Sequence, residues 1–273
     1  MPTRPYTVTR KLGTVFLYLK IVSQLRGKSA HARHVARRLS PPAKPRYIWH
    51  MIWNLPNSLT LLRLLAAPGI VLSFLFLPHP VSDWVALILF VGTSLTDFLD
   101  GYLARKWNQT SRFGAMLDPI ADKAMVVSAI AVLAMNFGPA TAIIFPAAFI
   151  LLRETFVSGL REFLGTTAGL LKVTRLAKWK TTAQMVAISV LFSYGLFAHY
   201  VGMGSFGMDG ATVDGILSGD IEDPNGFAWL YRGMVWSYGA GVILLWIAAI
   251  LTVVTGADYL RKAMPFLREA SDD

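Results

Sequence analysis

The sequence contains no cysteine and little charge. None of its 273 residues is Cys, and only 15% are Asp, Glu, Lys or Arg. The missing cysteines exclude disulfides, cysteine-ligated zinc and a thiol nucleophile. A soluble domain usually carries about 25% charged residues, whereas this chain is 54% hydrophobic. The composition therefore excludes a large soluble domain and predicts an all-α integral membrane protein, a bundle of transmembrane helices.

Acidic residues are missing from the first part of the chain, where the first acid is Asp83. Residues 1–50 hold eleven Lys or Arg and no Asp or Glu. Lys20 interrupts the apolar stretch of this segment and no small-residue cleavage site follows it, which argues against a simple signal peptide. Two interpretations stay open: a basic interfacial helix that binds anionic lipid, or a partly disordered tail that only fixes orientation.

Six apolar stretches follow, each close to the roughly 20 residues that cross a bilayer. We expect spans at about Asn57–Leu77, Asp83–Arg105, Asp118–Phe137, Ala140–Glu162, Lys178–Met203 and Met234–Leu260. Together they predict a six-helix transmembrane domain over residues 51–262 and a short tail over residues 263–273.

The connections between these spans alternate in charge. The segment before the first span, the Arg105–Leu117 loop and the Arg161–Lys180 connection are basic. Arg261, Lys262 and Arg268 follow the last span, and the acids near them count for little in this rule. The Pro78–Ser82 and Asn136–Pro139 turns carry no Lys or Arg, and residues 204–231 carry five acids and no base. Because Lys and Arg gather on the cytoplasmic side, the pattern predicts an inner or plasma membrane protein with both termini cytoplasmic. The acidic loop lacks the spacing of a calcium loop, and we expect a solvated connection.

Four aspartates stand out where the second span meets the third. On a helix, Asp97, Asp100, Gly101 and Ala104 share one face, and so do Gly114, Asp118 and Asp122. A helix hairpin would bring the four acids together at its loop-bearing end, which the charge alternation places at the cytoplasmic surface.

Four converging carboxylates repel one another, and a divalent metal removes that conflict. Carboxylate oxygens suit Mg²⁺ or Mn²⁺ rather than zinc, and two such ions form a clamp for phosphoryl transfer. Gly101 and Ala104 would let a nucleotide approach the backbone, with Arg105 at hand for its phosphates. Simpler interpretations exist: Asp118 before Pro119 is a good helix cap, and Gly101 and Ala104 would permit close helix packing.

The spacing of these residues matches a known signature. Asp97-x-x-Asp100-Gly101-x-x-Ala104-Arg105, eight residues and Gly114-x-x-x-Asp118-x-x-x-Asp122 resemble, without a gap, the signature of the CDP-alcohol phosphatidyltransferase family. The resemblance implies a six-helix membrane fold, usually a homodimer, that moves a phosphatidyl group from a CDP-linked lipid to an alcohol and releases CMP. It also implies site roles: metal ligation by Asp97, Asp100 and Asp118; completion of the metal site or base catalysis by Asp122; and a CDP pocket lined by Gly101, Ala104, Arg105 and Gly114.

A second level of similarity concerns the acceptor alcohol. The segments 55–63, 153–162 and 178–184 are similar to family members that use sn-glycerol 3-phosphate, which implies that compound and CDP-diacylglycerol as substrates. An anionic acceptor needs cations. Arg153 and Arg161 share one broad face of the fourth span, and Lys178 and Lys180 begin the fifth, so we expect a phosphate pocket beside the metals. Cytoplasmic Lys and Arg placement with snorkelling side chains is the alternative explanation.

Asn57 and Thr60, one turn apart, are assigned to the nucleotide pocket, although helix capping by Asn57 is the simpler account. Other acceptors stay open: inositol phosphate, serine or phosphatidylglycerol. A transporter or channel would also use intramembrane acids, but it would tend to place them near the midplane of repeated halves. A lipid-binding scaffold would leave the four aspartates unexplained. We expect no nucleic-acid partner.

Overall fold

The computed structural model of the protein describes residues 55–106, 111–165 and 175–269, and for residues 56, 98–106, 112, 175, 177, 268 and 269 within them only the backbone. The predicted basic segment, residues 1–50, lies outside the described residues. Residues 51–273 form one compact unit.

All regular elements in these ranges are helices, as the composition predicts. They are α4 (Leu55–Phe76), α5 (Val81–Lys106), α6 (Arg112–Phe137), α7 (Thr141–Leu164), α8 (Arg175–Gly204), α9 (Gly210–Ser218) and α10 (Phe227–Glu269). The six long helices correspond in order to the six expected spans.

Five of these helices, α4, α6, α7, α8 and α10, are long and apolar enough to cross a membrane. Large apolar side chains point outward along them, among them Leu65 (63% exposed), Leu152 (68%) and Ile243 (62%). Such a surface is stable only against lipid or another protein, so the chain is a multi-pass membrane protein. The expected sixth span, α5, is a 26-residue helix but is not among the five found within the described residues, so the count of six stays a prediction.

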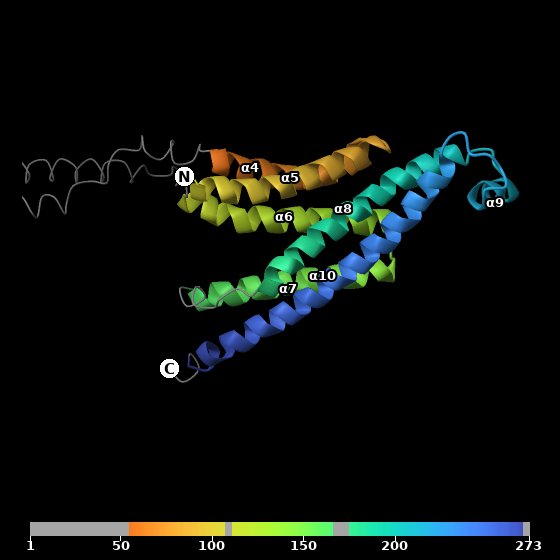
Figure 1. Cartoon of the computed structure of the whole chain (residues 1–273). Helices are drawn as coiled ribbons and strands as arrows, with labels where there is room; N and C mark the ends of the chain where they lie inside the picture. The colour runs from red at the N-terminus through yellow and green to blue at the C-terminus, as the bar shows by residue number, and fades with distance from the viewer. Residues whose placement is uncertain (1–54, 107–110, 166–174, 270–273) are drawn as a thin grey trace, which may run out of the picture. The chain divides into compact units, whose positions relative to one another are not determined.

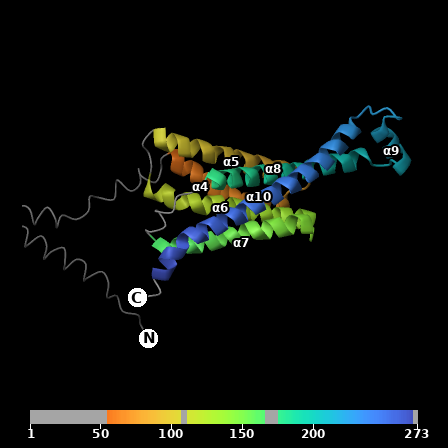
Figure 2. The same cartoon turned by 60° about the horizontal axis from the view of Figure 1, so that its bottom comes forward.

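The long helices pack in two connected groups (Figures 1 and 2). Helix α4 packs against α5 and α6, whereas α10 packs against α8 and α7, and α8 also contacts α5. Large core residues include Ile70, Phe90 and Leu245, and buried alanines such as Ala129 and Ala187 let the backbones approach closely.

Successive long helices run in opposite directions, so two ends of the bundle can be defined (Figure 1). The site end holds the beginnings of α4, α6 and α8 and the ends of α5, α7 and α10. The opposite end holds α9. The site end carries basic residues such as Arg161, Lys178 and Arg261, whereas the α9 end carries the five acids of residues 204–231.

The acidic segment is not the plain solvated connection that its sequence predicts. Asp209 caps α9 by accepting a hydrogen bond from the Thr212 N–H (2.9 Å). Asp223 caps α10 by accepting the N–H groups of Phe227 and Ala228, both at 2.8 Å. Ile216 of α9 packs with Val201 and Phe227 in a small apolar cluster. Two of the five acids are therefore helix caps.

Helix α6 begins earlier than the expected span. Ser111 is its N-cap and accepts a hydrogen bond from the Gly114 N–H (2.9 Å). Asp118 and Pro119 consequently lie in the second turn of α6, so the interpretation of Asp118 as a helix cap is wrong. The extra turns extend α6 far enough to place Asp118 and Asp122 beside α4.

Candidate functional site

The first turns of α4 present a polar face to α6. Asn57, Thr60 and Arg63 recur every three residues and are 3%, 2% and 2% exposed. The hydroxyl of Ser111 donates to Asn57 Oδ1 (2.8 Å), and that of Thr60 donates to Asp118 Oδ1 (2.7 Å). Buried polar groups need such partners, so this face fixes how α4 docks on α6.

Gly114 lies against this contact. A Cβ atom at Gly114 would come within 2.5 Å of Asn57 Oδ1 and 3.2 Å of Ser111 Oγ. Since real Cβ atoms do not approach so closely, glycine is required here to let the Asn57 side chain sit on the α6 backbone. The role of Gly114 in a CDP pocket stays a prediction.

Arg63 joins three helices through one nitrogen atom. Its Nη1 lies 2.5 Å from Asp97 Oδ1 on α5 and 2.6 Å from Asp122 Oδ1 on α6. The sequence reasoning did not assign Arg63 to the site. It could have, because Arg63 is the one charged residue of α4, and a lone charge inside an apolar helix indicates an ionic partner.

The arrangement of these acids fits a divalent cation. The two carboxylate oxygens lie 2.5 and 2.6 Å from the same nitrogen, so they converge on one cation, as oxygen ligands of a divalent ion do. The bond from Thr60 orients Asp118 beside them. Among the described side chains no group of three or more potential ligands is close enough to hold an ion. Asp100 is not among these side chains, because only its backbone is described.

Four predicted site residues lie at the end of α5, where only the backbone is described: Asp100, Gly101, Ala104 and Arg105. The helix runs unbroken to Lys106, so the helix on which their spacing depends is present. Their side-chain contacts lie outside the described residues.

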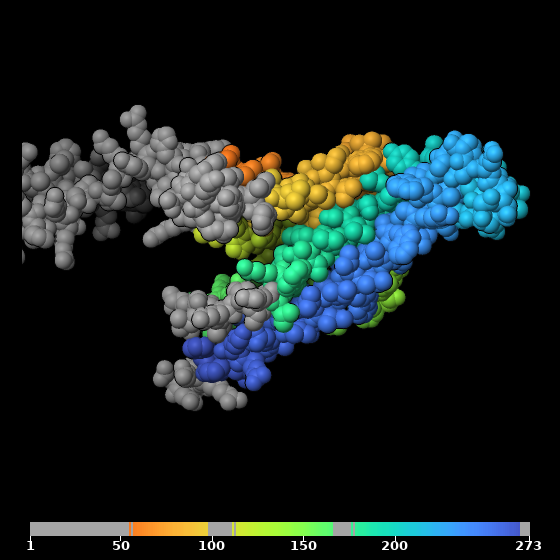
Figure 3. Space-filling model, viewed as in Figure 1, coloured from red at the N-terminus to blue at the C-terminus, as the bar shows by residue number. Residues whose placement is uncertain are grey.

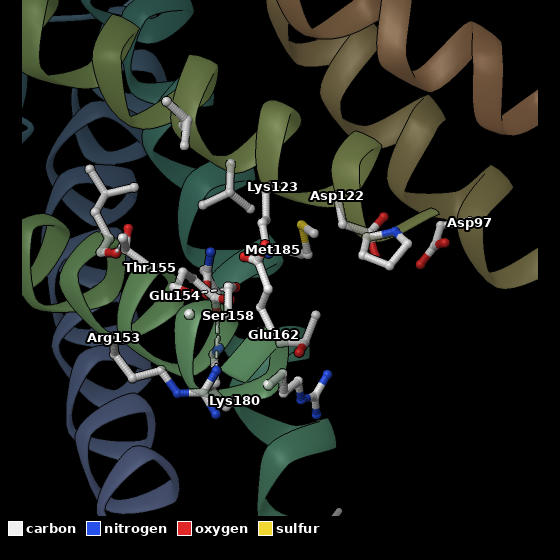
Figure 4. Close-up of a pocket in the computed structure, with 18 residues that line it drawn as sticks. Asp97, Asp122, Lys123, Arg153, Glu154, Thr155, Ser158, Glu162, Lys180 and Met185 are labelled. Carbon is white, nitrogen blue, oxygen red and sulfur yellow. Dashed lines mark hydrogen bonds and ion pairs between the residues drawn. The ribbon is translucent and has the colours of Figure 1, made fainter. Parts of the chain in front are cut away.

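A cavity of about 660 Å³ extends from the aspartates to a basic cluster on α7 and α8. Figure 3 shows the surface hollowed on this side, between the α5–α6 pair and the first turns of α8. In the close-up, Asp97 and Asp122 lie at one side and Arg153 and Lys180 at the other (Figure 4). The charged lining residues are Asp97, Asp122, Lys123, Arg153, Glu154, Arg161, Glu162 and Lys180.

Glu154 organises the basic side of the cavity. Its Oε1 forms ion pairs with Arg153 Nη1 (3.4 Å) and with Lys180 Nζ. Lys180 is only 4% exposed, so it depends on this carboxylate in place of water. The pairing fixes both cations at the cavity wall.

Three of the four predicted acceptor residues, Arg153, Arg161 and Lys180, line the same cavity as Asp97 and Asp122. Lys178 does not line it and is exposed. Residues two positions apart on a helix point in directions about 200° apart around its axis. Lys178 and Lys180 therefore cannot share a face.

Lys123 was missed by the sequence reasoning. It directly follows Asp122 and lines the cavity, as do the polar residues Thr155, Ser158 and Gln184. A lysine within an apolar span was a usable indication of a functional position. The hydroxyl and amide residues gave no such indication, because their place on the cavity depends on how α7 packs against α8.

Comparisons with known proteins identify the family of the chain. A sequence model of the family described as CDP-alcohol phosphatidyltransferase matches residues 53–208. A CDP-diacylglycerol–glycerol-3-phosphate 3-phosphatidyltransferase of Cereibacter sphaeroides is 52% identical over 219 residues, which is 80% of this chain and 99% of that protein. Proteins of the same name from Rickettsia bellii and Escherichia coli are 38% and 33% identical, over 78% of this chain and 97% and 96% of theirs. The chain therefore belongs to the CDP-alcohol phosphatidyltransferase family.

Proposed function

We propose that the protein transfers the phosphatidyl group of CDP-diacylglycerol to sn-glycerol 3-phosphate, which yields phosphatidylglycerophosphate and CMP. The observation that carries the proposal is the single cavity that joins Asp97 and Asp122 to Arg153, Arg161 and Lys180. Its acidic side suits a metal-bound pyrophosphate and its basic side suits an anionic acceptor. The names of the similar proteins support the same pair of substrates.

At the acidic side, Asp97, Asp100, Asp118 and Asp122 would hold Mg²⁺ or Mn²⁺, with two ions expected. Divalent metals are general in this family, and when bound they neutralise pyrophosphate charge and assist the departure of CMP. Thr60 orients Asp118 through its hydroxyl hydrogen bond. Arg63 offsets the mutual repulsion of Asp97 and Asp122.

The position of Asp122 on the cavity wall supports a role for its carboxylate in the chemical step. The acceptor hydroxyl oxygen attacks the phosphorus nearest the diacylglycerol, and the bond from that phosphorus to the CMP oxygen breaks. The carboxylate of Asp122 accepts the proton of the attacking hydroxyl. Positioning and electrostatics then supply most of the rate enhancement, as in other phosphoryl transfers.

At the basic side, Arg153, Arg161 and Lys180 would bind the phosphate of glycerol 3-phosphate, with Lys123 as a further cation on the wall. The planar guanidinium groups can donate two parallel hydrogen bonds to phosphate oxygens. Serine and phosphatidylglycerol lack a phosphate monoester, so they would leave these cations without a dianionic partner.

For the nucleotide, we propose Gly101, Ala104 and Arg105 as direct contacts of CDP. Asn57, Thr60 and Gly114 are buried in the α4–α6 contact. They would act by fixing the beginning of α6 and the carboxylate of Asp118, and so shape one wall of the nucleotide site.

The site end would face the cytoplasm, with both chain termini on that side. Basic residues favour this side, and both CDP and glycerol 3-phosphate are aqueous compounds. We propose a homodimer in the inner or plasma membrane, with a basic segment over residues 1–50 and a catalytic domain over residues 51–262. A tail follows over residues 263–273, into which α10 continues as far as Glu269.

The test is an acceptor panel with purified protein in lipid nanodiscs. With Mn²⁺ or Mg²⁺ and CDP-diacylglycerol, we expect CMP release with glycerol 3-phosphate and none with inositol phosphate, serine or phosphatidylglycerol. EDTA should abolish release. Release with inositol phosphate in place of glycerol 3-phosphate would show that the acceptor is misassigned.

A further inference from the structure

Helix α10 lies directly behind the basic side of the cavity. None of the described residues that line the cavity belongs to α10, and the family match ends at residue 208, before α10 begins. Yet α10 packs along α7 and touches both arginines that α7 contributes to the acceptor site. The contacts are made by Gly256 and Tyr259.

Gly256 accommodates the stem of Arg153. A Cβ atom at Gly256 would lie 2.8 Å from Arg153 Cγ and 3.5 Å from its Nε. Cγ is close to the backbone of Arg153 and cannot retreat without a change of rotamer, which would redirect the guanidinium. Glycine inside a helix costs about 1 kcal/mol relative to alanine. Alanine at position 256 would stabilise α10 itself, but only glycine leaves space for the Arg153 side chain.

Tyr259 supports Arg161 three residues further along α10. The guanidinium carbon of Arg161 lies 5.3 Å from the centre of the Tyr259 ring, within the range of a cation–π interaction. Tyr259 is 7% exposed, whereas Arg161 is exposed, so the fixed partner of the pair is the ring. An exposed arginine that rests on a buried ring loses much of its freedom before any ligand arrives.

Two buried donors beside these contacts lack a hydrogen-bond partner in the part of the chain that the structure describes. Arg153 Nε and the Tyr259 hydroxyl form no hydrogen bond with any described residue. Buried donors are nearly always paired, and Arg153 is itself a wall residue of the cavity. Its Nε is enclosed beside Gly256, so packing against α10, and not a hydrogen bond at Nε, holds this part of the guanidinium.

We propose that Gly256 and Tyr259 are positioning residues for the acceptor phosphate. Gly256 sets the path of Arg153, and Tyr259 holds Arg161, so that the two guanidinium groups converge on one phosphate monoester. The inference rests on the proposed function, because it assumes that the arginines bind the acceptor. It adds that acceptor recognition depends on α10, although α10 does not line the cavity.

The chain offers a matched pair of substitutions. Gly256→Ala introduces the contact with Arg153, whereas Gly239→Ala, in the same helix, places its Cβ where no atom lies within 4 Å. CMP release in nanodiscs gives kcat and the KM of each substrate. For Gly256→Ala we expect the KM for glycerol 3-phosphate to rise about tenfold or more, with the KM for CDP-diacylglycerol within about twofold. Gly239→Ala should match wild type in both.

A second pair tests Tyr259 and keeps the inference testable if Gly256→Ala fails to fold. Tyr259→Phe retains the ring and should leave the KM for glycerol 3-phosphate within about twofold of wild type. Tyr259→Leu should raise that KM several-fold and weaken competitive inhibition by inorganic phosphate. Elution from size exclusion and the thermal unfolding midpoint report folding of each variant.

The outcomes separate the two proposals. Wild-type protein that releases no CMP with glycerol 3-phosphate overturns the proposed function. Active wild type with unchanged KM values in both Gly256→Ala and Tyr259→Leu overturns only the role of α10. Equal rises in the KM of both substrates also overturn it, since they indicate general loosening of the fold.

Discussion

At the residue scale, Arg63 shows how a membrane protein holds acids at close range. Its guanidinium is 2% exposed and contacts carboxylates on two other helices. Asp97 and Asp122 are about half exposed, so water screens part of their repulsion, and the guanidinium offsets much of the rest. In the metal-free protein, Arg63 therefore supplies the positive charge that keeps Asp97 and Asp122 close together where cations would bind.

Arg63→Met should therefore make stability depend on metal. Removing the guanidinium leaves two carboxylates facing each other, at a cost of about 1–3 kcal/mol after screening. We expect a lower thermal unfolding midpoint than wild type in EDTA, and a larger rise on adding Mn²⁺. Arg63→Lys keeps a positive charge, so its thermal unfolding midpoint in EDTA should fall less. Equal midpoints for wild type and Arg63→Met in EDTA would contradict the role of Arg63 as counter-charge.

Thr60 tests whether orientation of a carboxylate matters for metal affinity. Its hydroxyl donates to Asp118 at 2.7 Å, and loss of such a partner typically weakens metal binding by about 10–100-fold. Thr60→Val, which is nearly the same size, should shift the Mn²⁺ dependence of CMP release to at least about tenfold higher concentration. Thr60→Ser keeps the hydroxyl and should stay near wild type. If both variants have the wild-type Mn²⁺ dependence, the bond does not support the metal site.

At the element scale, the contact between α4 and α6 joins the polar face of α4 to the aspartates. The chain of hydrogen bonds runs from the Gly114 N–H to Ser111 Oγ and from the Ser111 hydroxyl to Asn57 Oδ1. Gly114 permits it by leaving space for Asn57. The contact fixes the depth at which Asp118 and Asp122 meet α4.

Gly114→Ala should overpack this contact and lower the free energy of unfolding by about 1–3 kcal/mol. Because the clash is with Asn57 alone among side chains within 3 Å, the double variant Gly114→Ala/Asn57→Ala should recover part of that loss. Unfolding midpoints of both single variants and the double variant give the coupling. Gly92→Ala in α5, where a Cβ meets nothing within 4 Å, is the control. Strictly additive losses would show that Gly114 and Asn57 do not act together.

The six long helices could be predicted because apolar length and polar turns are local properties of the chain. The beginning of α6 could not, since Pro119 suggested a helix start that the capping by Ser111 overrides. The nine-residue α9 escaped prediction because a helix that short needs tertiary support, here from Val201 and Phe227.

The site divides in the same way. The aspartates and the α7 arginines follow from spacing on single helices. The bridge made by Arg63, the cavity position of Lys123 and the support from Tyr259 depend on how separate helices pack. No spacing within one helix encodes such contacts.

At the scale of the whole molecule, the two ends of the bundle differ in charge and in chemistry. The site end gathers the basic residues, the cavity and the aspartates, whereas the α9 end is acidic. Substrates that carry phosphate are attracted to the first and repelled by the second. The difference predicts which end faces the cytoplasm.

The missing cysteines make that orientation directly measurable, since any introduced thiol is unique. Ala211→Cys places an exposed thiol on α9, and Arg261→Cys places one at the site end of α10. We expect a membrane-impermeant maleimide to label Ala211→Cys in intact spheroplasts and Arg261→Cys only after the membrane is opened or inverted. Labelling of both after solubilisation in detergent is the control for thiol reactivity. The reverse pattern would place the site end outside the cell, away from CDP and glycerol 3-phosphate, and would contradict the proposed topology.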